Sequence, residues 1–395
     1  MEFVPFDQAV EIWDTLRKPV NAKERQNRIE GKDIHELYPY YGATGQVGYI
    51  DGYISDGEYV LLGEDGAPFL QPTATKAYLI HGKAWVNNHA HVLRSKFNNA
   101  FLCHYLNSFN YQGFVSGTTR LKLTQSAMKQ IPIPAPPISE QERIVSRIEE
   151  LFSQLDASVV ELKTAKERLR VYRQAVLKEA FEGTLTAPEK FGTALLGSYI
   201  EKPRYGTSKK CDYAHSEESV DVYRIPNIDY ATGQISHEDI KYSEFSNNEL
   251  AQIELESGDI LIIRSNGSVS LVGRAALVRE IDTKGTFAGY LMRLRIKDKS
   301  SLIPEFLLYY LQSHEARIYI ENKAKSTSGV HNINSAEISS LKIPVFRADD
   351  QESIVVTIES RLSVCDSIEK TVDTALQQAE ALRQSILKKA FEGGL

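Results

Sequence analysis

The chain has 395 residues, of which 42 % are hydrophobic and 25 % charged, and its formal net charge is −6. This length predicts two to three domains, and this composition is that of a globular protein without a membrane span or a secretory signal. The three cysteines, Cys103, Cys211 and Cys365, lie too far apart to predict a disulfide framework or a zinc site, so we expect a cytoplasmic protein.

Residues 1–138 are expected to form an α+β domain with a curved sheet and long loops. The run YVLLGEDGA at 59–67 is typical of a buried strand that ends in a turn, and FLCHYLNS at 101–108 is helical by pattern. The segment contains 13 basic and 13 acidic residues. It therefore lacks the broad positive field of a protein that binds nucleic acid without help.

Residues 139–186 predict one long helix that ends at Gly183. Four prolines between 132 and 137 forbid a helix before it, and the run SEQE from Ser139 fits a capping box with Ser139 as the cap. Apolar or small residues then recur in steps of four and three, as in the seam (the line of inward-facing residues) of a coiled coil. These positions are Ile144, Ile148, Leu151, Leu155, Ser158, Leu162, Ala165, Leu169, Tyr172 and Val176.

Residues 187–346 repeat the order of the first domain with different side chains. DILIIRSNG at 259–267 predicts a second buried strand and turn, and FLLYYLQS at 306–313 predicts a second helix. This segment has 19 basic and 21 acidic residues, so it too lacks a broad positive field.

Residues 347–395 repeat the helix. Residues 131–185 align without a gap on residues 341–395, and 21 of the 55 paired positions are identical. The run DDQE from Asp349 replaces the serine cap, and Gly393 is expected to end the helix. The second seam contains Ile354, Ile358, Arg361, Cys365, Ile368, Val372, Ala375, Ala379, Leu382 and Ile386.

The two seams match in phase and length. We therefore expect the helices to lie antiparallel as a coiled coil of about 60 Å, given a rise of about 1.5 Å per residue. The alternative is two separate amphipathic helices, each packed on its own domain.

No segment carries a recognisable catalytic or cofactor motif. The glycine-rich run at 42–48 has the wrong spacing for a dinucleotide loop, and the acidic cluster at 51–65 has no second half of an acid–base pair. His89 and His91 lack a third metal ligand and are expected to be packed or hydrogen-bonded. We therefore expect no catalytic residue, no bound cofactor and no metal.

The remaining polar loop residues are suited to reading nucleic acid. Arg, Asn, Thr and Ser side chains hydrogen-bond base edges and phosphate oxygens, although more than half of these segments also fit ordinary solvated loops. The stretches SGTTR and STSG matter most because they occupy corresponding places before the two helices. The candidate DNA contacts are Arg17, Lys18, Tyr41, Thr44, Gln46, Ser116, Thr118, Thr119, Arg120, Lys122, Arg204, Tyr205, Thr207, Ser208, Lys209, Arg264, Asn266, Ser268, Ser326, Ser328, His331 and Asn332.

The sequence resembles the specificity subunit of type I restriction–modification systems. The resemblance is carried by IPIPAPPISEQERIV with its long helix and LKEAFEGTL ending, and by SGVHNINSAEISSLKIPV and QESIV in the second copy. YPYYGATG and GEDGA in the first domain, and RYGTSKK and GDILIIRSNG in the second, add to it.

The resemblance implies two target-recognition domains, 1–138 and 187–346, each of which reads one half of a bipartite, asymmetric DNA site. It implies that the spacer helices, 139–186 and 347–395, form a pseudo-twofold repeat that sets the gap and docks two methyltransferase subunits. Those partners would bind S-adenosylmethionine and methylate adenine, and a restriction subunit would join a fuller complex. The chain itself would be non-catalytic, without a cofactor and without a membrane partner. The unusual DDQE lead-in implies a less typical second docking face.

Two alternatives remain open. A coiled-coil adaptor with two α+β heads for protein or carbohydrate is favoured slightly by the acidic charge. A self-contained DNA methyltransferase or nuclease fragment is disfavoured because no cofactor loop and no Pro-Pro-aromatic motif are found.

Overall fold

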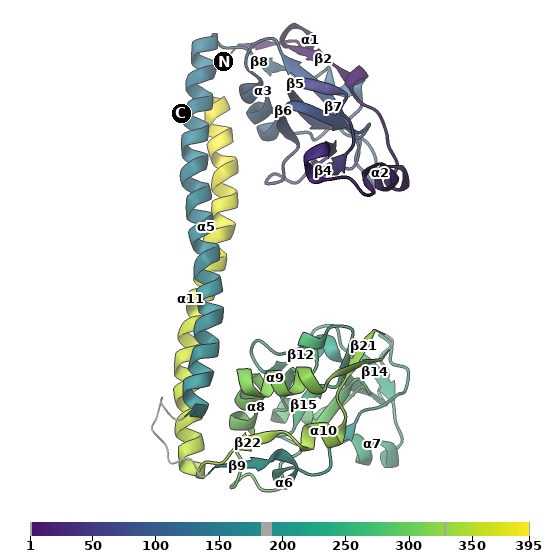
Figure 1. The fold of residues 1–395 in the computed structure, drawn as a ribbon, viewed down its shortest axis with the longest axis vertical. Helices are drawn as coiled ribbons and strands as arrows, with labels where there is room; N and C mark the ends of the chain where they lie inside the picture. The colour runs from purple at the N-terminus through teal and green to yellow at the C-terminus, as the bar shows by residue number, and fades with distance from the viewer. Residues whose placement is uncertain (1, 183–191, 328, 395) are drawn as a thin grey trace. The chain divides into compact units, whose positions relative to one another are not determined.

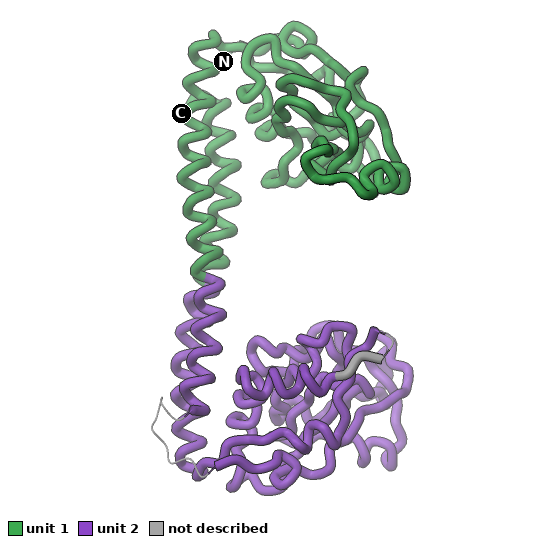
Figure 2. The backbone as a smooth tube through the Cα atoms, viewed as in Figure 1, with its two compact units in different colours: residues 1–165, 371–395 green, residues 166–370 purple. Residues whose placement is uncertain are grey.

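The computed structural model describes residues 2–182, 192–327 and 329–394. The chain divides into two compact units, residues 1–165 with 371–395 and residues 166–370 (Figure 2). Each unit combines one globular part with a stretch of both long helices, whereas the sequence predicted globular domains and helices as four separate segments. The predicted boundaries near 138, 186 and 346 stay predictions, and 186 lies outside the described residues. We call residues 2–134 the first head and residues 193–344 the second head.

The first head is an α+β domain around a six-stranded sheet in the order β2-β7-β5-β6-β3-β4 (Figure 1). Its strands are β2 (Val10–Ile12), β3 (Tyr38–Gly42), β4 (Gly45–Ile50), β5 (Ser55–Gly63), β6 (Ala77–Val86) and β7 (Ala90–Ser95), and a separate pair joins β1 (Phe3–Val4) to β8 (Ile133–Pro134). Its helices are α1 (Phe6–Ala9), α2 (Ala22–Ile29), α3 (Asn99–Ser108) and α4 (Gln125–Met128). Neighbouring strands are antiparallel except β3 and β6, which are parallel.

The core of the first head lies between α3 and the sheet. Val60 and Leu62 of β5 and Leu102 and Leu106 of α3 belong to one cluster of buried side chains. Leu61, between them on the strand, is buried in a second cluster, so β5 has apolar partners on both faces. The predicted buried strand and helix are confirmed.

The second head has several smaller sheets around a central strand, β15 (Ile260–Ile263). The strands are ordered β10-β19-β15-β17, β14-β11-β18, β16-β21-β20, β12-β13 and β22-β9. Their bounds are β9 (Thr193–Leu195), β10 (Arg204–Tyr205), β11 (Ser219–Tyr223), β12 (Ile228–Asp229), β13 (Gln234–Ile235), β14 (Lys241–Glu244), β16 (Ser265–Asn266), β17 (Ala275–Leu277), β18 (Thr286–Phe287), β19 (Leu291–Leu294), β20 (Lys325–Thr327), β21 (Val330–Asn332) and β22 (Lys342–Pro344). The helices are α6 (Leu196–Tyr199), α7 (Asn247–Ile253), α8 (Pro304–Gln312), α9 (His314–Lys323) and α10 (Ser335–Ser339).

The two heads share one backbone framework. β15 pairs antiparallel with β17 and β19, as β5 pairs with β6 and β7. Ile343 of β22 pairs with Ala194, as Ile133 of β8 pairs with Val4, and the two isoleucines are equivalent in the sequence repeat. The second strand and helix that the sequence predicted are also confirmed as β15 and α8.

The long helices are α5 (Ile138–Glu182) and α11 (Ala348–Glu392), each with 45 residues. In the first unit, Ile144 and Ile148 of α5 cluster with Ile386 and Leu387 of α11. In the second unit the order is reversed, and Leu177 near the end of α5 clusters with residues near the start of α11. The helices therefore run antiparallel within each unit, which confirms the predicted coiled coil.

Burial along the helices agrees with most of the predicted seam. The buried seam residues are Ile144, Ile148, Val176, Ile354, Ile358, Cys365, Val372, Ala379 and Ile386, and the half-buried ones are Leu151, Leu155, Leu162, Ala165, Leu169 and Ala375. Five seam predictions are wrong, since Ser158, Tyr172, Arg361, Ile368 and Leu382 are exposed, Ile368 to 44 % and Leu382 to 50 %. The following residues, Glu369 and Arg383, are less exposed instead, because both form ion pairs with α5.

The helix ends differ slightly from the prediction. α5 begins at Ile138 and α11 at Ala348, so Ser139 and Asp349 lie inside the first turn and are not caps. The carbonyl oxygen of Pro137 accepts the first helical hydrogen bonds, and a proline at this point loses no bond through its missing N–H. Gly393 ends α11 with a φ of 84°, as predicted, and Gly183 lies outside the described residues.

Each head is joined to the end of one long helix by three aromatic rings. Phe391 of α11 lies 5.2 Å from Phe101 and 5.3 Å from Tyr105 of the first head, between ring centres. Its repeat equivalent, Phe181 of α5, lies 5.3 Å from Phe306 and 5.2 Å from Tyr310 of the second head. The repeated helices thus fix each head at an equivalent place.

Candidate nucleic-acid interface

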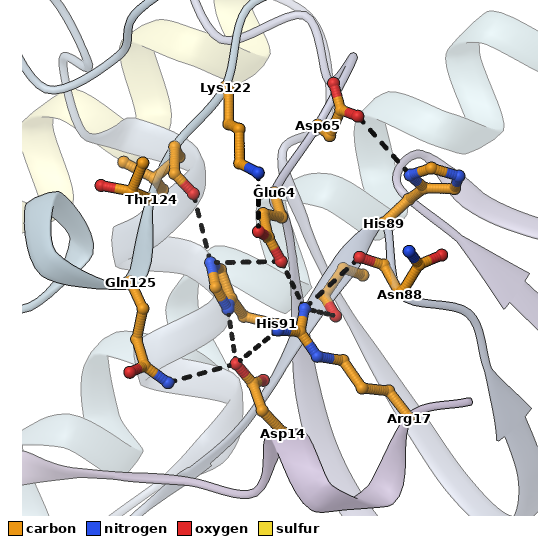
Figure 3. Close-up of polar contacts among 12 residues, drawn as sticks. Asp14, Arg17, Glu64, Asp65, Asn88, His89, His91, Lys122, Thr124 and Gln125 are labelled. Carbon is orange, nitrogen blue, oxygen red and sulfur yellow. Dashed lines mark hydrogen bonds and ion pairs between the residues drawn. The ribbon is translucent and has the colours of Figure 1, made fainter. Parts of the chain in front are cut away.

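In the first head, five charged or ionisable side chains form one network at the end of β5 (Figure 3). The guanidinium of Arg17 contacts the carboxylates of Glu64 and Asp14, the latter at 3.1 Å. The ring of His91, which is fully buried, lies 2.9 Å from Asp14 through Nδ1 and 3.2 Å from the Leu123 carbonyl through Nε2. Lys122 approaches Glu64 at 3.4 Å. The network therefore pairs Arg17 and Lys122, two of the predicted DNA contacts, with carboxylates.

Burial and charge oppose each other in this network. Burial raises the pKa of Asp14, but the His91 hydrogen bond and charge, the Val92 amide and Arg17 outweigh it, so the pKa is lowered overall. Burial likewise raises the pKa of Glu64, and Arg17, with help from His91 and Lys122, lowers it overall. Both carboxylates are therefore charged at neutral pH.

The other candidates of the first head lie around this network. Tyr41 accepts a backbone hydrogen bond from Asn87, next to the Asn88 carbonyl that faces Arg17. The loop from Ser116 to Lys122 is closed by two backbone hydrogen bonds between those residues. Thr118, Thr119 and Arg120 project from that loop, and Lys18, Thr44 and Gln46 are exposed. Arg120 forms an ion pair of 2.7 Å with Asp65.

The two histidines do not form a metal site. His91 is hydrogen-bonded and buried, as predicted, and His89 lies 3.7 Å from Asp65. Across the part of the chain that the structure describes, no group of three His, Cys, Asp or Glu side chains could hold a metal ion.

In the second head, the three polar segments that the sequence singled out come together. The guanidinium of Arg264 stacks 4.3 Å above the ring of Tyr205. Asn266 pairs with His331 across β16 and β21, and Ser326 pairs with His331 across β20 and β21. The remaining candidates in this head are Arg204, Thr207, Ser208, Lys209, Ser268 and Asn332, while Ser328 lies outside the described residues.

A glycine fixes the first of these segments against the sheet. A Cβ atom on Gly206 would lie 2.1 Å from the carbonyl oxygen of Phe287 and 2.5 Å from that of Ala288. The amide of Thr207 donates to Phe287 at 2.9 Å, and the amide of Gly289 donates to Thr207 at 2.7 Å. Only glycine allows this close approach of the backbones.

Beside this contact lies a cleft of about 550 Å³, lined in part by Thr207 and Gly289, which we call the second-head cleft. Its wall carries four cationic side chains, namely Lys209, Arg224, Lys241 and Arg264. None of its lining residues, all within the described range, is acidic. The exposed ring of Tyr290 and the apolar side chains of Ile225 and Pro226 complete the wall. The cleft thus offers positive charge and an aromatic surface together.

Glu64 and Arg264 occupy equivalent places in the two heads. The carbonyl oxygen of Glu64 accepts from the amide of Leu123 at 2.8 Å, and that of Arg264 accepts from the amide of Ile333 at 2.9 Å. Leu123 and Ile333 are 210 positions apart, which is the offset of the helix repeat that follows them. The amide of Glu64 donates to His89 and that of Arg264 to Tyr290. One framework position is therefore acidic in the first head and basic in the second.

Sequence reasoning missed several of these residues. Asp14 was not singled out, and Glu64 and His91 were assigned no partners. Arg224, Lys241 and Tyr290 of the cleft lie in unremarkable sequence, and only the sheets bring them beside Arg264. The sequence had already singled out Thr207, Ser208, Lys209 and Arg264 of the cleft wall, and the aromatic Tyr290 just before the strand LMRL was one further signal.

The sequence matches the family described as "Type I restriction modification DNA specificity domain" over residues 11–166 and 207–378. It is 30 % identical over 308 residues to the type I restriction enzyme EcoKI specificity subunit of Escherichia coli (strain K12). It is 29 % identical over 306 residues to the StySPI specificity subunit of Salmonella potsdam. Each alignment covers 75 % of this chain but 65 % of the relative, which is less than two thirds.

A solved structure on complex assembly and conformational transition of the type I R-M system contains a chain with the same fold. It has 18 % sequence identity and a TM-score of 0.72, and the match covers 100 % of this chain and 98 % of that one. Because the family match covers both heads and most of both helices, this chain belongs to the family of type I restriction modification DNA specificity domains.

Proposed function

We propose that this chain is the non-catalytic DNA-recognition subunit of a type I restriction–modification complex. Each head reads one half of a bipartite, asymmetric DNA site, while α5 and α11 set the gap. The observation that carries this proposal is the pair of like frameworks with unlike side chains, seen most clearly at Glu64 and Arg264. Heads that share a backbone but differ in their polar loops suit two different half-sites. The family match supports this role over that of a protein-binding adaptor.

The helices are the proposed docking faces for two methyltransferase subunits. Tyr172 of α5 and Leu382 of α11 are equivalent in the sequence repeat and are 44 % and 50 % exposed. Exposed apolar side chains at matched positions suit two copies of one partner. In this proposal the partners bind S-adenosylmethionine, the chain binds no cofactor, and the complex acts in the cytoplasm, with a restriction subunit as an optional addition.

Methylome sequencing of cells with and without this chain tests the role directly. We expect one split adenine motif to disappear when the chain is deleted. Exchanging the first head for that of another family member should change one half of the motif and keep the other half. A head exchange that alters both halves, or a deletion that leaves the methylome intact, would contradict the proposal.

Lengthening the coiled coil tests the spacer role. Seven residues inserted after Ala165 of α5, with a matched heptad before Thr371 of α11, preserve the seam and add about 10 Å of helix. The gap in the motif should grow by about three base pairs, since one duplex turn of about 10 base pairs spans about 34–36 Å. If the lengthened complex is active and the gap in its motif is unchanged, the helices do not set the gap.

The near-neutral charge of both heads leads to a further expectation. The chain alone should bind DNA weakly, and its affinity should rise sharply with the methyltransferase partner, which would supply much of the phosphate neutralisation. Tight, sequence-selective binding by the chain alone at physiological salt would contradict this account.

A further inference from the structure

We propose that the second-head cleft holds one phosphate-bearing nucleotide of the bound DNA strand, and that the first head has no equivalent site. The inference rests on the proposed function, because the nucleotide is taken to belong to the DNA target. It goes further by locating a cationic anchor in one head only.

The charge balance of the cleft favours an anion. Lys209 is paired with Glu249 at 2.9 Å and Arg224 with Asp239 at 2.8 Å, so these two cations are largely neutralised. Lys241 and Arg264 form no ion pair with a carboxylate in the described part of the chain, although the charge of Lys241 still acts on Asp239 at longer range. Their charges contact aromatic rings instead, those of Tyr213 and Tyr205. Two cations that form no ion pair with a carboxylate attract a phosphate to the cleft, since charge-assisted hydrogen bonds to phosphate are strong.

The shape of the cleft favours a nucleotide over a bare ion. Its volume of about 550 Å³ lies in the range of small-molecule sites. The ring of Tyr290 is 63 % exposed beside the cations, which leaves an aromatic face for a base or sugar. Base stacking on an aromatic ring is worth about 1–3 kcal/mol and tolerates different bases.

The first head lacks this combination because Glu64 stands where Arg264 stands in the second head. Glu64 holds Arg17 and Lys122 in ion pairs, so the equivalent position repels an incoming phosphate. His89 occupies the place of Tyr290 and faces Asp65. The two heads therefore differ because an acidic residue, Glu64, stands in the first where a basic residue, Arg264, stands in the second, and because each forms different contacts.

Cys211 gives a direct readout of the cleft. It lines the cleft and is half-buried, whereas Cys103 and Cys365 are 7 % and 1 % exposed. Alkylation of Cys211, followed by mass spectrometry of its peptide, reports whether the cleft is filled. The other two cysteines report unfolding, because they react only when the fold opens. Burial raises the pKa of the Cys211 thiol, so a pH of about 8.5 suits the reaction.

The experiment uses the full chain assembled with its methyltransferase subunits, and the complex without DNA sets the baseline rate. Saturating target DNA should slow alkylation of Cys211 at least tenfold, whereas inorganic phosphate and free dAMP at the same concentration should not. The double variant Arg264→Gln and Lys241→Gln should lose the protection of Cys211 by DNA. It should also make the negative slope of log affinity against log salt shallower by about 1 to 2. Lys297→Gln, on an exposed lysine outside the cleft, should change neither quantity.

The outcomes separate this inference from the proposed function. If the complex binds its DNA while Cys211 reacts at the baseline rate, the cleft proposal is overturned and the recognition role stands. Protection by dAMP without protection by DNA overturns it too, because the site would then take a free nucleotide. If no DNA is bound at all, the recognition role itself has failed.

Discussion

The guanidinium of Arg173 on α5 donates a hydrogen bond of 2.6 Å to the carboxylate of Asp366 on α11. In the sequence repeat, Arg173 corresponds to Arg383 and Asp366 to Asp156, and those two residues form the same pair in the other unit. All four residues are identical between the copies at their matched positions. One interhelical contact is thus made twice, with the roles of α5 and α11 exchanged.

We expect this pair to contribute modestly to the free energy of unfolding. Asp366 is largely exposed, while Arg173 is mostly covered and also contacts Glu369 at 3.0 Å. Arg173→Met should therefore cost about 1 kcal/mol. A double-mutant cycle with Asp366→Asn, read by chemical denaturation, should give a coupling of about 0.5 kcal/mol that weakens in high salt. A coupling of zero at low salt would show that the ion pair adds no stability and that apolar packing alone holds the two helices together.

His104 should make the first unit sensitive to mild acid. Its ring lies edge-on to Phe152 at 5.7 Å, and burial, with the nearby charge of Arg383, lowers its pKa from 6.5 to about 4. Because the folded-state pKa is below the unfolded value, the unfolded chain takes up the proton first. Stability is then complete above about pH 6.5 and falls by on the order of 2 kcal/mol toward pH 4.

The control is His104→Tyr, which places the residue of the matched second-head position, Tyr309, in the first head. This variant should flatten the dependence of unfolding free energy on pH between 6.5 and 4, as measured by urea titrations at fixed pH. An equally steep dependence in the variant would assign the effect to other groups.

The sequence predicted the regular parts of this protein well because each had a local period or a second copy. β5 and α3 follow from apolar runs, and the coiled coil follows from the repeated seam. The seam fails at Ser158 and Tyr172 in the first copy, at the matched Ile368 and Leu382 in the second, and at Arg361. An apolar pattern cannot show that the next residue turns inward to form an ion pair.

The polar sites were harder to predict because their members lie far apart in the sequence. Arg264 belonged to a predicted segment, but its partners in the second-head cleft lie up to 57 residues away, at Thr207. Nothing local to Lys241 or Arg224 distinguishes it from a solvated surface cation. The ion pair of Arg17 with Glu64, which is 47 residues away in the sequence, could not be predicted for the same reason.

Gly206 should be essential to the second-head cleft. In Gly206→Ala the new methyl group would lie 2.1 Å from a backbone oxygen, so the loop that carries Lys209 must move away. We expect a loss of about 2 kcal/mol or more and faster hydrogen exchange at Thr207 and Gly289. Gly267→Ala is the matched control in the same head, since nothing lies within 4 Å of its added Cβ. Equal, small effects of both changes would mean that the loop is not held by this contact.

Arg17 and Lys122, both proposed as DNA contacts, should separate into a structural and a binding residue. The side chain of Arg17 is 21 % exposed and faces two carboxylates, whereas that of Lys122 is 50 % exposed and has one partner at 3.4 Å. Arg17→Met leaves Glu64 without its main cation and removes one cation from Asp14, so it should destabilise the first head by about 1–3 kcal/mol. Lys122→Met should change stability by less than about 0.5 kcal/mol. It should instead weaken DNA binding by the assembled complex and reduce the salt slope by about 1.

Thermal unfolding and salt-dependent fluorescence anisotropy, measured on both variants, separate the effect on stability from the effect on DNA binding. If Arg17→Met leaves stability unchanged and weakens DNA binding, Arg17 is the residue that contacts DNA. Its ion pair with Glu64 would then exist only in the chain without DNA.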